Sequence, residues 1–102
     1  MKKENPYVLS SDIKPLTYHL DLTPNIKELT FKGEEKIKID VLKDTKEISL
    51  NIKELEIVSV HLQDHSLKKM EENKEKQIIT FYFNEVIKKE EHHLIIIFKG
   101  KI

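Results

Sequence analysis

Residues 31–41 read F-K-G-E-E-K-I-K-I-D-V, and the alternation in this stretch decides the fold. Phe31, Ile37, Ile39 and Val41 fall on one face of an extended chain, and the other face carries Lys32, Glu34, Lys36, Lys38 and Asp40. A strand with so regular a period buries one face and exposes the other to water. The stretch therefore predicts a β-strand that covers one side of a core.

The same period recurs on both sides of this stretch and predicts further strands. Three segments supply inward-facing sets, which are Tyr18, Leu20 and Leu22, then Ile48, Leu50 and Ile52, then Ile79, Phe81 and Phe83. Residues 55–62 change phase partway, which indicates a β-bulge. Residues 94–98 are apolar on both faces, as in a central strand or one covered by a partner. The chemistry of turns favours Pro24-Asn25, Lys43-Asp44 and Asn84-Glu85 as connections.

Together these segments predict an all-β fold, an antiparallel β-sandwich or strongly bent sheet of about six to seven strands. The length of 102 residues suits one domain. We expect residues 1–14 to form an N-terminal arm and residues 15–102 a single β domain. Residues 64–77 are rich in charge and poor in apolar side chains, so we expect a charged, solvated loop there.

Composition restricts the classes of partner and chemistry. Lysine and arginine number 18, equal to aspartate and glutamate, so the zero net charge argues against nucleic acid as the sole partner. The chain has no cysteine, which excludes disulfides, thiolate nucleophiles and cysteine metal sites. The N-terminus lacks the apolar core of a secretory signal, and no apolar run is long enough to span a bilayer. We therefore expect a cytoplasmic protein that does not bind membranes.

Two histidine-containing motifs have the residue types of a metal site. His61 and His65 have the spacing of the H-E-x-x-H zinc motif, but Leu62 replaces its glutamate, and a strand would hold the imidazoles roughly 13 Å apart. Residues 90–93 read E-E-H-H, yet adjacent residues of a strand face opposite ways. Neither motif completes a coordination shell. The sequence thus predicts no cofactor, no metal ligand and no catalytic residue.

Several segments, taken in order, carry a resemblance to a known family. They are Pro15-x-x-Tyr18-x-Leu20-x-Leu22-x-Pro24, Phe31-x-Gly33, Ile48-x-Leu50-Asn51 and Leu94-x-Ile96-x-Phe98-x-Gly100. The succession resembles the N-terminal β-domain of the zinc aminopeptidase family, of the aminopeptidase N and puromycin-sensitive aminopeptidase type. The resemblance implies a β-rich saddle that frames a substrate cleft, with zinc and the catalytic residues in the following domain.

The chain also departs from the family pattern. It contains neither H-E-x-x-H nor the G-x-M-E-N segment that grips the substrate amino terminus, and it stops where family members continue with further strands. From this we expect a truncated relative without enzymatic activity of its own. The alternative is that the chain is the N-terminal fragment of an active zinc aminopeptidase whose catalytic domain lies outside it.

The leading hypothesis from the sequence is a non-catalytic β-sandwich module that docks on a larger protein or ribonucleoprotein assembly. Loss of the later strands would leave an unpaired edge near residues 94–98, which a partner or a second copy would cover. The residues expected to bind the partner are Ile95 and Ile97 at this edge and Lys68, Lys69, Lys74 and Lys76 in the charged loop. A weaker reading is a small accessory protein that binds a metal or RNA.

Overall fold

The computed structural model describes residues 12–52 and 55–101, which form seven β-strands. The strands are β1 (Ile13–Asn25), β2 (Thr30–Val41), β3 (Thr45–Asn51), β4 (Leu55–Leu62), β5 (Leu67–Asn73), β6 (Ile78–Ile87) and β7 (Glu91–Lys101). The described part of the chain has no helix long and apolar enough to cross a bilayer. The all-β prediction is confirmed.

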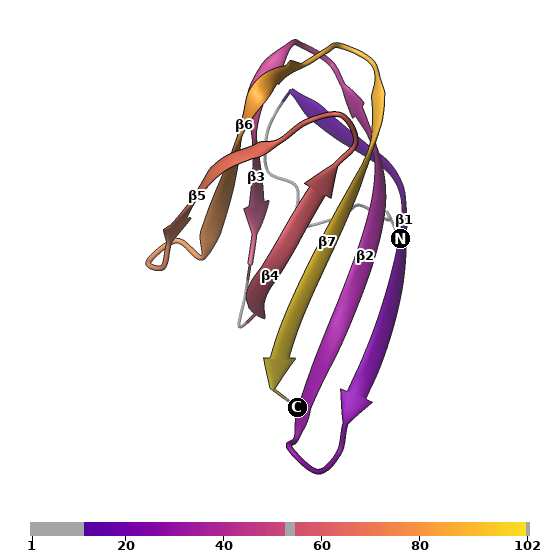
Figure 1. Cartoon of the computed structure of the whole chain (residues 1–102), viewed down its shortest axis with the longest axis vertical. Helices are drawn as coiled ribbons and strands as arrows, with labels where there is room; N and C mark the ends of the chain where they lie inside the picture. Colours follow the sequence, from indigo (N-terminus) through magenta and orange to yellow (C-terminus); the bar gives the residue numbers. More distant parts are fainter. Residues whose placement is uncertain (1–11, 53–54, 102) are drawn as a thin grey trace.

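The strands form two antiparallel sheets. The large sheet has the order β1-β2-β7-β4, and the small sheet has the order β3-β6-β5. The small sheet covers one end of the large sheet, while the ends of β1, β2 and β7 near the β1–β2 turn extend beyond it (Figure 1). One face of the large sheet is therefore covered along only part of its length.

The core lies between the two sheets. Ile39 of the large sheet and Ile48 and Phe81 of the small sheet are fully buried. The predicted inward sets of β3 and β6 are confirmed, because Ile48, Leu50, Ile52, Ile79, Phe81 and Phe83 are all buried. The three residues predicted to face inward on β1 are not buried. Tyr18, Leu20 and Leu22 face the same side as the core but are 44%, 47% and 55% exposed, since the small sheet does not reach them.

The two glycines of the chain pair with two phenylalanines across β2 and β7. Phe31 lies opposite Gly100, and Gly33 lies opposite Phe98. Each ring lies over the glycine opposite it, since a Cβ on Gly100 would meet Phe31 Cζ at 2.7 Å and a Cβ on Gly33 would clash with the Phe98 ring. The two rings also meet edge to face, with centroids 6.3 Å apart. The repeated F-K-G sequence thus packs against itself, as aromatic residues do over glycines in other sheets.

The bulges and turns of the structure agree in part with those predicted from the sequence. The predicted bulge is confirmed, because the β4–β7 register shifts between Ile57 and Ser59. Residues 42–44 connect β2 to β3, as predicted. The prediction of a turn at Asn84-Glu85 is wrong, because both residues belong to β6 and Asn84 N donates to the carbonyl of Ser66 at 2.9 Å. The first turn occupies residues 26–29, just after the predicted Pro24-Asn25.

Two predicted boundaries also differ from the structure. Ile13 and Lys14, assigned to the arm, already belong to β1, and the rest of the arm up to residue 11 lies outside the described residues. The segment predicted as a charged loop, 64–77, contains strand β5, all of whose residues are exposed. β5 forms because β6 offers a paired backbone edge, which compensates for the lack of apolar side chains.

Candidate docking surfaces

Ile95 and Ile97 lie on the outer face of the large sheet, away from the core. The expectation that they lie at an edge is wrong, because β7 is flanked by β2 and β4. β7 pairs with β2 along one side. β4 pairs along its other side, which the sequence analysis expected to be unpaired. Both isoleucines are half-buried. Their cross-strand neighbours are polar, with Lys36 and His61 beside Ile95 and Glu34 and Ser59 beside Ile97.

The four predicted lysines lie on β5 and on the turn that follows it. Lys68 falls at a register shift of β5, and Lys74 and Lys76 lie in the turn at residues 74–77. Lys69 pairs with Glu71 at 3.2 Å and lies 5.0 Å from the centre of the Tyr82 ring. Three glutamates, Glu71, Glu72 and Glu75, interleave with the lysines. This end of the molecule is therefore charged without being strongly basic.

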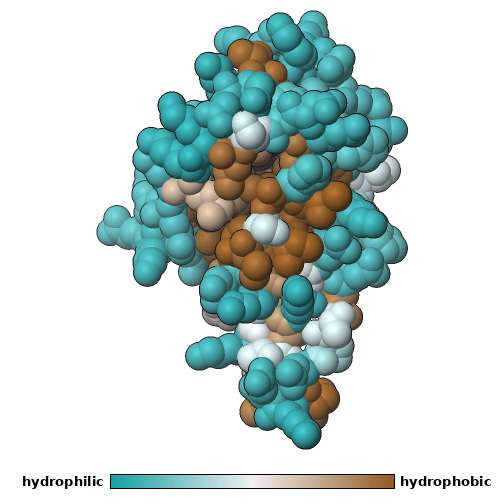
Figure 2. Space-filling view, in the orientation of Figure 1, coloured by the Kyte–Doolittle hydropathy of each residue, from teal (hydrophilic) through white to brown (hydrophobic). Residues whose placement is uncertain are grey.

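A pocket of about 190 Å³ lies at the uncovered end of the core. Its walls are apolar side chains from both sheets, among them Leu20 and Leu22 of β1 and Leu50 of β3. Two polar side chains line it, Glu35 of β2 and Asn51 of β3. Apolar surface also gathers in the middle of one face of the molecule, ringed by hydrophilic residues (Figure 2). The pocket therefore connects the apolar core to solvent next to the carboxyl group of Glu35.

Glu35 is the one buried charged residue in the described part of the chain, with 5% of its surface exposed. It lies on the inner face of β2, with Leu20 and Ile96 as cross-strand neighbours. It makes no hydrogen bond or ion pair with any residue that the structure describes. Burial raises the pKa of the Glu35 carboxyl, because the apolar surroundings disfavour its charged form.

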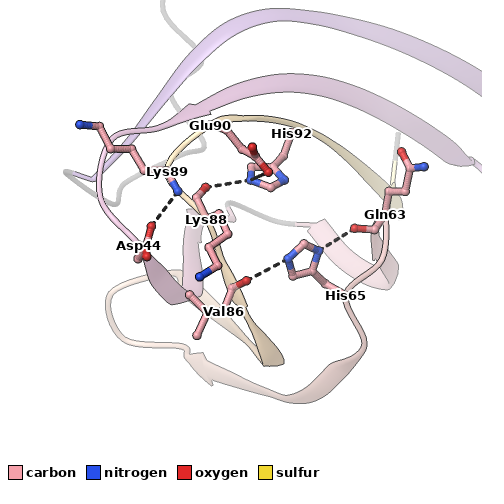
Figure 3. A network of polar contacts seen from close by, with 8 residues as sticks. All are labelled: Asp44, Gln63, His65, Val86, Lys88, Lys89, Glu90 and His92. Atoms are coloured by element: carbon pink, nitrogen blue, oxygen red, sulfur yellow. Dashed lines mark hydrogen bonds and ion pairs between the residues drawn. The ribbon is translucent and has the colours of Figure 1, made fainter.

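Two histidines lie close together, His65 in the connection that follows β4 and His92 at the start of β7 (Figure 3). The rings of His65 and His92 meet edge to face with centroids 5.5 Å apart. His65 Nδ1 lies 2.6 Å from the carbonyl oxygen of Gln63, and its Nε2 lies 3.2 Å from that of Val86. His92 Nε2 lies 2.9 Å from the carbonyl oxygen of Lys88. These contacts fasten the β4–β5 connection to the end of β6 and the start of β7.

This arrangement accounts for both histidine motifs of the sequence. His61 is exposed on the outer face of β4, whereas the His65 ring packs against Phe83 of the core, with centroids 6.5 Å apart. The two rings therefore do not converge. His92 and Glu90 approach only to 4.0 Å. Within residues 12–52 and 55–101, no three His, Asp or Glu side chains come close enough together to hold a metal ion.

Sequence reasoning missed the pocket and its carboxyl group. Residues 31–41 do indicate that Glu35 faces inward, because a period of two places it on the same face as Phe31, Ile37 and Ile39. A charged residue in an inward phase indicates a functional or strained position. What the pattern could not show is that the small sheet ends before this point and leaves a pocket.

The comparisons with known proteins agree with the fold. The family model for the peptidase M1 N-terminal domain matches residues 14–102, so the chain belongs to this family. It is 35% identical over 83 residues to Aminopeptidase 2 of Candida albicans (strain SC5314 / ATCC MYA-2876). The match covers 81% of this chain and 9% of that relative. The chain therefore corresponds to a small part of the length of the curated relative it matches.

Proposed function

We propose that this chain is a non-catalytic N-terminal domain of a zinc aminopeptidase, and that it docks on the rest of the enzyme through the inner face of β1. The match to the N-terminal domain model over residues 14–102 carries the proposal. The exposure of Tyr18, Leu20 and Leu22 supports it, because an apolar sheet face left open in one domain is the kind of surface that another covers. The cytoplasm is the proposed location.

The zinc of such an enzyme would not be held by the residues described here. A catalytic zinc site needs three protein ligands on one side of the ion. The described histidines and carboxylates do not provide such a set, and both nitrogens of His65 already face backbone carbonyls. The contribution of this domain is then to position and shield other parts of the enzyme.

The test is to isolate the native protein from its source with an antibody against residues 68–76 and to measure its intact mass and its activity. The proposal predicts a mass several-fold above the 12.1 kDa of this chain and chelator-sensitive hydrolysis of aminoacyl-p-nitroanilides. A species of 12.1 kDa without this activity would contradict it.

A second candidate function is a separate binding module that docks on a larger protein or ribonucleoprotein assembly. The half-buried pair Ile95 and Ile97, surrounded by polar groups on the outer face, favours it. The charged segment with Lys68, Lys69, Lys74 and Lys76 would contribute to the same contact. Self-association through an exposed edge is a proposal for the edge strands β1, β4, β3 or β5, since β7 is not an edge.

Substitution Ile97→Lys tests this second candidate, with Thr23→Lys as the control on the exposed outer face of β1. If the outer face binds a partner, Ile97→Lys abolishes co-purification of that partner from the source and Thr23→Lys leaves it intact. Equal co-purification with both variants would exclude Ile97 from the contact.

A further inference from the structure

We propose that the pocket at Glu35 is a binding site for a lysine side chain presented by another polypeptide, whose ammonium group pairs with the Glu35 carboxylate. The inference goes beyond the assignment to an aminopeptidase and does not depend on it. It follows from the burial of one carboxyl group, the size of the pocket and the two strands that border it.

Among residues 12–52 and 55–101, no side chain or backbone group gives Glu35 the hydrogen bond or counter-charge that buried carboxylates ordinarily have. Only 5% of its surface is exposed, and its cross-strand neighbours are the apolar residues Leu20 and Ile96. A charged group buried without a hydrogen bond or counter-ion is unfavourable, so such groups are paired or bind a ligand. A cation that enters the pocket would supply the missing counter-charge.

The dimensions of the pocket fit one long side chain. Its volume of about 190 Å³ is below the range of about 300–1,000 Å³ typical of small-molecule sites. Leu20, Leu22 and Phe31 line the pocket together with Glu35. A lysine has the complementary form, because its stem is apolar and its charge is at the tip.

The polar lining favours lysine over arginine. Glu35 and Asn51 are the two polar side chains among the lining residues. An ammonium group has three donors, which two carboxylate oxygens and one amide oxygen can accept. A guanidinium has five donors in a planar fork and would leave some of them unpaired in an apolar pocket.

The strands that border the pocket are suited to a polypeptide partner. β1 ends the order of the large sheet and β3 ends the order of the small sheet, and both line the pocket. An edge strand offers backbone groups to which an extended segment can add. Alternate side chains of such a segment point to one face, so one lysine could enter the pocket while its neighbours stay outside.

The experiment uses the 102-residue chain and n-hexylammonium as a probe for the lysine stem and head. Methyl NMR spectra of Leu20, Leu22 and Ile96 are recorded during titration to millimolar concentrations. The neutral probe 1-hexanol controls for apolar binding. Glu35→Gln removes the charge at nearly constant shape, and Glu34→Gln is the matched control on the opposite face of β2.

The proposal predicts saturable shifts of these methyl groups with n-hexylammonium and at least tenfold weaker binding of 1-hexanol. Glu35→Gln should weaken binding of the cation at least tenfold, whereas Glu34→Gln should bind as the parent chain does. Three results would each overturn the proposal. They are equal binding of both probes, equal binding of the cation to Glu35→Gln, and no saturable shift at the three methyl groups.

Discussion

In the part of the chain that the structure describes, Glu35 is the one charged residue that is buried. Because burial raises the pKa of its carboxyl above the ordinary value of 4.5, the folded chain holds this proton more tightly than the unfolded chain does. The group therefore lowers stability at neutral pH. This penalty disappears as the pH falls below the ordinary pKa, where the carboxyl is protonated in both states.

Substitution Glu35→Leu should stabilise the chain by roughly 1–3 kcal/mol at pH 7, because it removes a buried carboxyl that has no partner among the described residues. The gain should be smaller below pH 4.5, where the parent carboxyl is neutral in both the folded and unfolded states. Urea denaturation at several pH values measures both effects. Glu34→Leu serves as a control on the outer face, with an expected change within about 0.5 kcal/mol. A destabilised Glu35→Leu variant at pH 7 would show that the carboxyl has a stabilising partner.

The two glycines should respond unequally to alanine. A Cβ on Gly33 would meet the Phe98 ring, which is buried, so Gly33→Ala should cost about 1–3 kcal/mol. A Cβ on Gly100 would meet Phe31, which is only partly buried and can move, so the cost should be smaller. Denaturant unfolding of both variants measures the difference. Equal and negligible effects would mean that the rings do not lie over the glycines in solution.

Among the elements, two neighbouring strands of the small sheet, β6 and β5, differ strongly in how far they are buried from solvent. β6 lies in the centre of the sheet and buries Ile79, Phe81 and Phe83, whereas every residue of β5 is exposed. β5 is attached to the domain through its pairing with β6. Strands with few buried contacts open locally at lower free energy than core strands do.

Amides of β5 that pair with β6 should therefore exchange with deuterium at least tenfold faster than those of β6 that pair with β3. A factor of ten corresponds to about 1.4 kcal/mol in the free energy of opening. Hydrogen exchange followed by NMR resolves the two groups of amides. Equal protection of both would indicate that β5 opens only with global unfolding.

The elements differ in how far the sequence alone predicts them. The alternation in residues 31–41 and the phase change within residues 55–62 are local, so β2 and the bulge in β4 could be predicted. β5 could not, because its existence depends on a backbone edge offered by β6 rather than on its own side chains. The apolar run at residues 94–98 suggested a central strand as one interpretation, and β7 is central, but no local pattern specifies that β4 is its second neighbour.

The candidate site was predictable to a lesser degree. Ile95, Ile97 and the lysines of residues 68–76 were predicted from exposure and charge, and no contact in the structure tests them as binding residues. The pocket at Glu35 needed the three-dimensional arrangement. It exists because the small sheet ends before Leu20 and Leu22, and the extent of a covering sheet is a property of the whole fold.

At the scale of the whole molecule, the domain is a sandwich closed at one end and open at the other. The histidine contacts fasten the closed end (Figure 3), and the apolar residues of β1 remain exposed at the open end. A domain of this form gains stability when another polypeptide covers the open face. We propose that the inner face of β1 is such a docking surface.

Hydroxyl-radical footprinting tests this claim most directly. The measurement compares the isolated 102-residue chain with the native species purified from its source, with exposed Met70 of β5 as the internal control. We expect Tyr18, Leu20 and Leu22 to react in the isolated chain and to be several-fold protected in the native species, while Met70 reacts alike in both. Equal reactivity of the β1 residues in the two samples would contradict it.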